Sequence, residues 1–383
     1  MKKSLIAIAA LAAVGAASAQ SSVTLYGLAD VYFGQSKTRV VPADTDSGTN
    51  KTVVKTDSGT NKTVVKTTGF NSGGLQGSRI GVKGVEDLGN GLKAVFNYEM
   101  GFDAIDGALT KNGSSDVGFG RRAVVGVQGG FGSVLLGRDY TPLFNLLGAS
   151  SVDGLSSFET VGADIYTDRT NGIHYAGNFS GVGVQAFAGY NREKTTDDLG
   201  VDTDTKYQGY GLGVSYANGP FMVGLAAQEF KNKTNGVQDG KRSEAGVGAS
   251  YDFGAAKLFA NYVQLRAHGD AAEAYAGAVG APYTAFDKVK SEEANIGVRV
   301  PFGAASVMAG YGHNRAKAYI NGDQVGKAKG NDWIVGANYA FSKRTDVYAR
   351  VGRSDDMKFK YADGDSAGST KSDNYAIGLR HKF

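Results

Sequence analysis

From about residue 20 onward, the chain consists of stretches of about ten residues in which apolar side chains occupy every second position. In 209–216, Tyr210, Leu212, Val214 and Tyr216 alternate with glycine and serine. A period of two residues is the signature of a β-strand, whose successive side chains point to opposite faces. The pattern therefore predicts an all-β protein.

The two faces of these predicted strands differ in character. In 332–341, one face carries Asp332, Gly336 and Asn338, which are too small and too hydrated for a protein core. The apolar face ends in Tyr339 and Phe341, and membrane barrels place aromatic girdles at such positions. A soluble β-sandwich would also alternate, but its buried face would carry bulky branched side chains. We therefore favour a transmembrane β-barrel over the sandwich.

The connections between the strands are of two kinds. Seven are short turns, at 86–91, 129–132, 178–181, 217–220, 252–255, 301–304 and 342–345. Eight are longer polar stretches, near 35–76, 102–118, 139–168, 191–205, 231–241, 265–289, 316–330 and 354–372. Together they join sixteen antiparallel strands, and short periplasmic turns with long extracellular loops are typical of closed bacterial outer-membrane barrels. Closure gives every backbone polar group in the lipid a partner on a neighbouring strand.

The first nineteen residues have the layout of a secretory signal peptide. Lys2 and Lys3 precede an apolar run from Leu5 to Ala17, and Ala17-Ser18-Ala19 supplies the small residues of a cleavage site. The run is shorter than the roughly 20 apolar residues of a membrane-spanning helix. We expect residues 1–19 to be removed and residues 20–383 to form a single barrel domain in the outer membrane.

Composition narrows the possible functions. The 383 residues include 57 glycines and no cysteine, which excludes disulfide scaffolds, thiol catalysis and cysteine-based metal sites. The 41 basic residues nearly balance the 37 acidic ones, so the basic surplus of a nucleic-acid-binding protein is missing. We expect no nucleic acid, metal or other cofactor to bind.

One segment is duplicated: Thr45–Lys55 recurs without change as Thr56–Lys66. Eleven extra residues inside a strand would turn every following side chain to the other face, because the strand period is two. The duplication is therefore predicted to lie in a loop. It is either a variable surface epitope or a neutral insertion that the loop tolerates.

Several motifs together resemble the general trimeric porins of β-proteobacteria, and the resemblance covers essentially the whole chain after the signal peptide. The first group consists of the start of that part of the chain and a predicted strand with its turn: Ser22–Gly27, Gly77–Gly84 and Glu86–Gly91. The second group lies at the two ends of the predicted third long loop: Gly137–Pro142 and Arg169–Ile173.

This resemblance implies a sixteen-stranded barrel that assembles as a homotrimer and lets small hydrophilic solutes and ions diffuse passively through a water-filled channel. It implies a third loop, beginning near 137–142, that folds into the lumen and narrows the pore. It also implies contact with outer-membrane lipid and lipopolysaccharide, and insertion by the barrel-assembly machinery. The alternating C-terminus resembles the signal which that machinery reads, at Tyr375, Ile377, Leu379 and Phe383.

In such porins, basic side chains on the wall face the third loop across the narrowest part of the channel. The alternation places four candidates for this basic side in the lumen or at its edge: Arg79, Lys83, Arg122 and Arg169. The candidates for the acidic side, on the third loop, are Asp153, Glu159 and Asp164. A field between the two sides would select by charge, and we expect a weak preference for anions.

Two other functions fit a barrel. A hydrolase would need a serine–histidine pair, but none of the four histidines has a nucleophile and an acid at a recognisable spacing, and no catalytic motif occurs. We therefore do not expect an enzyme. A surface adhesin or antigen would be rich in repeated loop elements, and only residues 45–66 have that character.

Overall fold

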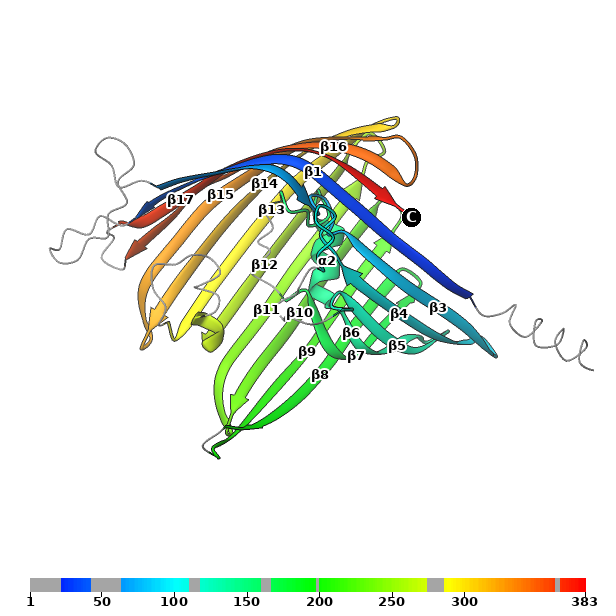
Figure 1. Cartoon of the computed structure of the whole chain (residues 1–383), viewed down its shortest axis with the longest axis horizontal. Helices are drawn as coiled ribbons and strands as arrows, with labels where there is room; N and C mark the ends of the chain where they lie inside the picture. The colour runs from blue at the N-terminus through cyan, green and yellow to red at the C-terminus, as the bar shows by residue number, and fades with distance from the viewer. Residues whose placement is uncertain are drawn as a thin grey trace, which may run out of the picture.

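The protein is a closed antiparallel β-barrel, described by a computed structural model for residues 22–42, 63–109, 118–159, 167–197, 200–273, 286–361 and 366–383 (Figure 1). The predicted signal peptide lies outside these residues. The strands are β1 Ser22–Pro42, β2 Thr63–Ser72, β3 Arg79–Gly89, β4 Leu92–Gly101, β5 Arg122–Gly129, β6 Gly132–Tyr140, β7 Arg169–Phe179, β8 Val182–Thr196, β9 Asp202–Asn218, β10 Phe221–Thr234, β11 Val237–Asp252, β12 Lys257–Gly269, β13 Lys288–Phe302, β14 Ala305–Ile320, β15 Asp323–Ala340, β16 Thr345–Tyr361 and β17 Ser366–Lys382. The helix α2, Pro142–Ser150, lies inside the barrel (Figure 1).

Seventeen strands occupy sixteen places around the barrel, which confirms the predicted number. The first part of β1 pairs with β3 and its later part pairs with β2, so that β2 and β3 follow one another along a single place in the wall. The pairing of β1 with β17 closes the barrel. At the end of this seam, Gly27 and the terminal Phe383 exchange two backbone hydrogen bonds, of 2.9 and 3.1 Å.

All seven predicted short turns join neighbouring strands. Asn90 and Gly91 connect β3 to β4 with φ angles of 52° and 76°, and both values lie in the left-handed region. Two-residue hairpin loops of this kind match the right-handed twist of the strands. Asparagine and glycine adopt these angles at little cost, which explains their use at this turn.

The extent that we predicted for several long loops is wrong. The structure continues the strands through most of 231–241 and 316–330, and joins them by tight turns at Asn235-Gly236 and Asn321-Gly322. These strands rise well beyond the membrane because their hydrogen-bond ladders continue in the polar region. Asn-Gly is itself a strong hairpin signal, but the polar composition around it led us to expect loops.

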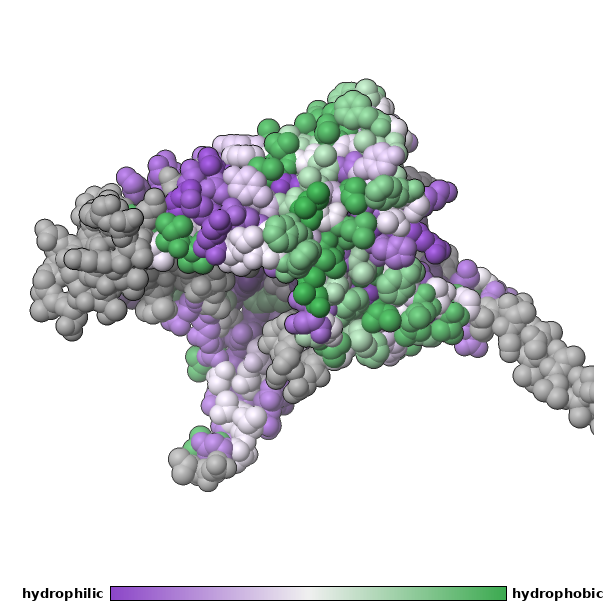
Figure 2. All heavy atoms as spheres, turned by 45° about the horizontal axis from the view of Figure 1, so that its top comes forward, coloured by the Kyte–Doolittle hydropathy of each residue, from purple (hydrophilic) through white to green (hydrophobic). Residues whose placement is uncertain are grey.

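The outer face of the barrel is apolar, as the alternation predicts. Leu212, Ile296 and Ile377 are 53%, 64% and 63% exposed, although they lie in the middle of long strands. Figure 2 shows apolar side chains gathered in a band over this face, with hydrophilic side chains beyond it. A band of this kind faces lipid in outer-membrane barrels. Among the described residues, no helix is long and apolar enough to cross a membrane.

The duplicated segment falls only partly on described residues. Residues 45–62 lie outside them, but Thr63–Lys66, the last four residues of the second copy, form the start of β2. They pair with Lys37–Val40 of β1. The prediction that the whole duplication lies in a loop is therefore wrong for these four residues, because strand pairing extends beyond the membrane.

Deleting Thr56–Lys66 is expected to leave folding and conductance unchanged. The first copy ends in the same Thr-Val-Val-Lys sequence, so Thr52–Lys55 would take the places of Thr63–Lys66 before Thr67. No residue of β2 would change its face. Heat-dependent gel mobility and single-channel conductance measure the outcome. A deletion of Thr63–Lys66 alone is the control, since it places Asn61-Lys62 before Thr67. Loss of assembly in the longer deletion would contradict the prediction.

Candidate functional site

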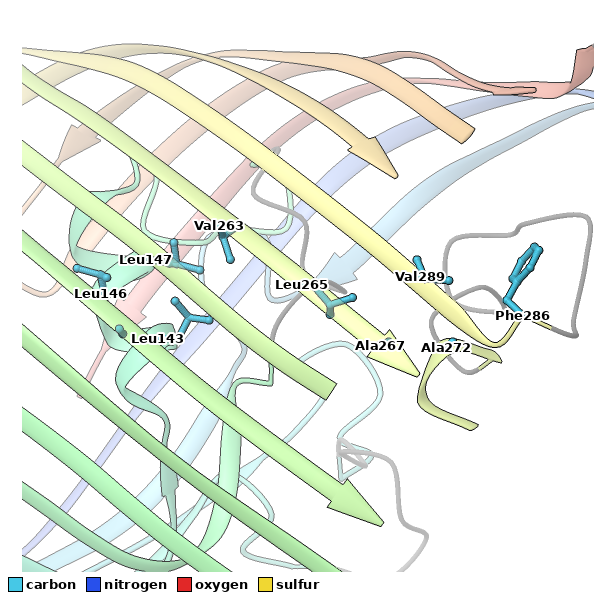
Figure 3. Close-up of a cluster of buried hydrophobic side chains, with 10 residues drawn as sticks. Leu143, Leu146, Leu147, Val263, Leu265, Ala267, Ala272, Phe286 and Val289 are labelled. Atoms are coloured by element: carbon cyan, nitrogen blue, oxygen red, sulfur yellow. The ribbon is translucent and has the colours of Figure 1, made fainter. Parts of the chain in front are cut away.

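The segment between β6 and β7 folds into the lumen, as the resemblance implies. It begins with α2, whose N-cap is Thr141: the Thr141 hydroxyl accepts a hydrogen bond from the backbone N–H of Phe144. Pro142 is the first helical residue, where its lack of an N–H costs nothing. Leu143 and Leu147 are fully buried. Figure 3 shows these leucines beside Val263 of β12, so that α2 lies flat against the inner wall.

Glycines on that wall make room for the helix. A Cβ atom on Gly246 would lie 2.8 Å from a methyl carbon of Leu143, and one on Gly224 would lie 2.8 Å from a methyl carbon of Leu146. Real Cβ atoms do not approach other atoms so closely, so a larger side chain at either position would force the facing leucine methyl group to move. The side chains on the inner face of the strands were judged too small for a protein core. At Gly224 and Gly246, however, this face forms one side of a small hydrophobic core with α2.

The rest of the loop continues along the inner wall. Val152 packs with Met308 and Ile334, both of which point inward from β14 and β15. The Asp153 carboxylate accepts two hydrogen bonds from Arg350 of β16, at 2.7 and 2.8 Å, and lies 3.3 Å from Arg299. The side chains of Asp153 and Arg350 are 2% and 1% exposed. Asp153 thus fastens the loop to the wall, and its charge is neutralised there.

The carboxylate of the half-buried Glu159 is bonded within the loop. Its carboxylate accepts hydrogen bonds from the Ser151 hydroxyl at 2.7 Å and from the backbone N–H groups of Asp153 and Leu155 at 3.3 and 2.9 Å. Burial raises the pKa of the Glu159 carboxyl. The hydrogen bonds of Glu159 stabilise the backbone conformation of the third loop.

The far end of the described loop reaches the opposite part of the wall. The backbone N–H and the hydroxyl of Ser157 donate hydrogen bonds to the carbonyl oxygens of Gly74 and Gly73, at 3.0 and 2.8 Å. The Phe158 ring packs edge-on against Tyr32 of β1, with ring centres 5.1 Å apart. The described part of the third loop up to residue 159 is therefore held against the wall at several points.

Basic side chains gather on the wall that the loop leaves uncovered. Glu99 of β4 lies at their centre: it accepts a hydrogen bond from Arg121 at 2.7 Å, lies 3.9 Å from Arg79, and accepts a hydrogen bond from the Tyr26 hydroxyl at 3.1 Å. The ammonium of Lys83 lies 5.3 Å from the centre of the Tyr26 ring. Two arginines thus share one carboxylate.

A second part of this cluster surrounds the start of the third loop. Arg122 donates a hydrogen bond to Asp139 at 2.7 Å, and its side chain is 31% exposed. Arg169 pairs with Asp168, and its guanidinium lies 4.4 Å from the centre of the Tyr140 ring. Because its side chain is only 6% exposed, Arg169 packs within the structure rather than lining the water.

The structure thus brings the four predicted basic residues into one region and adds Arg121, which the sequence reading missed. In this cluster, five cations face three carboxylates. The cations are Arg79, Lys83, Arg121, Arg122 and Arg169, and the carboxylates are Glu99, Asp139 and Asp168. Of the predicted acidic side, Asp153 is buried, Glu159 is half-buried with its carboxylate bonded within the loop, and Asp164 lies outside the described residues.

Comparison with known proteins places this architecture in a family. The family model described as Gram-negative porin matches residues 5–358. The chain belongs to the Gram-negative porin family. The resemblance seen in the sequence motifs is confirmed, and with it the location of this porin in the outer membrane.

Individual relatives agree with the family. The porin is 35% identical to outer membrane porin protein 32 of Delftia acidovorans over 271 residues, which cover 67% of this chain and 68% of that one. It is 30% identical to an outer membrane porin protein of Bordetella pertussis, strain Tohama I, with both chains fully covered. The solved structure of an anion-selective porin from Comamonas acidovorans is similar in fold, with a TM-score of 0.66, 25% identity, and coverage of 95% of this chain and all of that one.

Two further features of the porin bear on the site. Within the described ranges, no group of three histidine, aspartate or glutamate side chains is arranged to hold a metal ion. A groove of about 610 Å³, lined by residues such as Leu258, Ile296 and Tyr311, lies on the outer face of β10–β14. Because it opens toward lipid, this groove is not part of the solute path.

Proposed function

We propose that this outer-membrane diffusion channel passes small hydrophilic solutes and ions with a weak preference for anions. The observation that carries the preference is the charge of the channel wall. The basic cluster holds two more cations than carboxylates, Asp153 of the third loop is neutralised by Arg350, and the carboxylate of Glu159 is bonded by the loop's own groups. The similar porin from Comamonas acidovorans is anion-selective, which supports the same sign.

A reversal potential measured across a planar bilayer under a salt gradient tests this proposal. We expect steady conductance from the purified protein, and a reversal potential on the anion-selective side. Unit charges near a narrow water path act on an ion with roughly 1 to 4 kcal/mol, depending on screening, which is enough for a several-fold bias. Cation selectivity would contradict the preference. The absence of conductance would favour the adhesin or antigen alternative.

Assembly adds further parts to the proposal. The chain is made with residues 1–19 as a cleaved signal peptide, is inserted by the barrel-assembly machinery and forms a homotrimer in contact with lipopolysaccharide. The outward alternation of Tyr375, Ile377 and Leu379 supports an assembly signal, since these side chains are 48%, 63% and 48% exposed. Phe383 completes this alternation, and its ring lies over Gly27 at the seam of the barrel.

The hydrogen-bond contacts of the histidines fit a channel that carries out no catalysis. Ring nitrogens of His174 and His313 hydrogen-bond to the Thr170 carbonyl oxygen and the Asn331 side chain, at 3.1 and 2.7 Å. His381 contacts the Thr345 hydroxyl at 2.9 Å on the exposed end of the wall. None of these contacts joins a nucleophile to an orienting carboxylate, as a hydrolase requires.

A further inference from the structure

Residues 73–78 interrupt the place in the wall that β2 and β3 share, and we call them the inset. Their sequence is Gly-Gly-Leu-Gln-Gly-Ser. Leu75 is 4% exposed, and a Cβ atom on Gly74 would lie 2.9 and 3.0 Å from the rings of Tyr32 and Phe158. Phe158 belongs to the third loop, inside the barrel. The inset therefore folds into the lumen instead of continuing the strand.

Asp30 of β1 determines the shape of the inset. Its side chain is fully buried, and one carboxylate oxygen accepts hydrogen bonds from the backbone N–H groups of Leu75 and Gln76, both at 2.8 Å. Hydrogen bonds from backbone N–H groups to a carboxylate are about twice as strong as neutral ones. The Asp30 backbone binds the two ends: its N–H donates to the Ser78 hydroxyl at 3.0 Å, and its carbonyl oxygen accepts from the Gly73 N–H at 2.8 Å. One residue thus binds the whole inset.

The other carboxylate oxygen of Asp30 is bound from two strands away. The Tyr348 hydroxyl of β16 donates a hydrogen bond to it at 2.6 Å. Between the two residues lies β17, where Gly378 is opposite Tyr348 in the ladder. A Cβ atom on Gly378 would overlap the Tyr348 ring, so the glycine lets this ring lie across β17. Asp30 therefore connects the inset to both sides of the seam at which β1 and β17 close the barrel.

The inset contacts both the third loop and the basic cluster. Its Gly73 and Gly74 carbonyl oxygens accept the two hydrogen bonds from Ser157 of the third loop. Near its other end, a Cβ atom on Gly77 would lie 3.0 Å from Nη1 of Arg121 in the basic cluster. A Cβ atom on Gly73 would in turn lie 3.2 Å from the Gly77 Cα atom, so the inset closes on itself. It therefore holds this part of the third loop at a short, fixed distance from Arg121.

We propose that the inset forms a third side of the narrow passage, with Gly77 as a specificity-determining position and Asp30 as the positioning residue of the inset. This deepens the proposed function, and it rests on the protein being a diffusion channel. Gly77 is exposed, whereas the neighbouring Ser78 is buried. Because residue 77 carries no side chain, a small anion in the passage can approach the Arg121 guanidinium. Larger hydrophilic solutes are held back by the width that the inset sets.

The variant Gly77→Cys tests this position directly, because the chain has no other cysteine. The folded channel in a planar bilayer is treated with a negatively or a positively charged methanethiosulfonate. We expect either adduct to lower the single-channel conductance to about half, since it narrows a water path lined by charges. The negative adduct should also shift the reversal potential toward cations, and the positive adduct should not. A cysteine that does not react, or an adduct that leaves the conductance unchanged, would overturn the proposal.

The matched control is Gly130→Cys, in the short turn between β5 and β6, where a Cβ atom would meet no other atom within 4 Å. Its adducts, verified by mass, should leave conductance and reversal potential at the values of the unmodified channel. Equal effects at both positions would show that the reagents disturb the channel in general, and this would overturn the role of Gly77. A wild type without any conductance would contradict the proposed function instead, whereas a conducting wild type with inert Gly77→Cys adducts would contradict the inset alone.

Two substitutions of Asp30 test its positioning role. Asp30→Leu removes the acceptor of both N–H groups of the inset, whereas Asp30→Asn keeps one oxygen for them. Swelling of protein-containing liposomes compares the entry of a trisaccharide with that of a monosaccharide. We expect this ratio to rise about threefold or more in Asp30→Leu, because the pore lining loses its fixed width, and to return to the wild-type value in Asp30→Asn. An unchanged ratio in Asp30→Leu, or an equal rise in both variants, would overturn the positioning role.

A second buried carboxylate at the same seam separates positioning from stability. Asp373 of β17 forms ion pairs with Arg39 and Arg353. Asp373→Leu should lower the melting temperature, as Asp30→Leu does, but keep the wild-type ratio of trisaccharide to monosaccharide entry. A raised ratio in Asp373→Leu would show that any weakening of the seam widens the channel, and would overturn the proposal. If Asp30→Leu does not assemble, the adducts of Gly77→Cys decide, because that variant keeps Asp30.

Discussion

Replacing Arg350 by methionine is expected to destabilise the barrel by about 3–5 kcal/mol, because it leaves the Asp153 carboxylate buried without its main partner. The Arg350 guanidinium donates to both oxygens of Asp153, to the carbonyl oxygens of Ala337 and Ala349, and to the Asn338 side chain. Arg299, 3.3 Å away, would be the only described cation left beside the carboxylate, together with the Ser156 hydroxyl, which donates a hydrogen bond to it at 2.8 Å. Equilibrium unfolding in urea with detergent or lipid measures the loss.

The same substitution should also change the channel, since Asp153 fastens the third loop to the wall. We expect larger and noisier single-channel currents. Arg353→Met is the matched control: Arg353 also pairs with an aspartate, Asp373, but its side chain is 36% exposed. An exposed pair contributes about 1 kcal/mol or less. The double variant Asp153→Leu, Arg350→Met should be more stable than Arg350→Met alone, and equal or lower stability would argue against a buried charge as the cause.

Replacing Arg79 and Arg122 together by glutamate is expected to reverse the selectivity of the channel. Each substitution changes the local charge by two, so the surplus in the basic cluster falls from 2 to 2 − 4 = −2. Arg122 should contribute more, because its side chain is 31% exposed and that of Arg79 is 17% exposed. The reversal potential under a salt gradient should move clearly toward cations, with conductance changing less than selectivity.

The control for charge alone is Lys317→Glu, Lys329→Glu, which makes the same change on the outer face of β14 and β15. At about 1 M salt the Debye length is about 3 Å, so these charges do not act across the wall. The control should keep the wild-type reversal potential. If the arginine variant also kept it, Arg79 and Arg122 would lie away from the narrowest part of the channel.

The strands and short turns could be predicted from the sequence because each rests on local chemistry. Alternation fixes the two faces, and residues such as Asn90 and Gly91 fix a turn. The long hairpins above the membrane were missed although Asn235-Gly236 and Asn321-Gly322 mark them, since the alternation there is between polar residues and gives no contrast.

The site was harder to predict because its partners are far apart in the chain. The ion pairs of Asp153 join residues separated by 146 and 197 positions, and no local pattern links them. Asp153 and Glu159 were expected to face water, but the wall buries and pairs Asp153, and the loop's own groups bind the carboxylate of the half-buried Glu159. Arg121 was missed because it precedes the first residue of β5, where alternation no longer assigns a face.

The glycines beneath α2 make the packing of the third loop against the wall depend on residues that never touch a solute. Gly224 and Gly246 are covered by the helix, yet a methyl group added at either would have to displace Leu146 or Leu143. Because each methyl carbon is the far end of a flexible side chain, the leucine can rotate to make room. Single glycine-to-alanine changes can therefore tune how closely the loop packs against the wall, while the charged lining that faces the solute keeps its sequence.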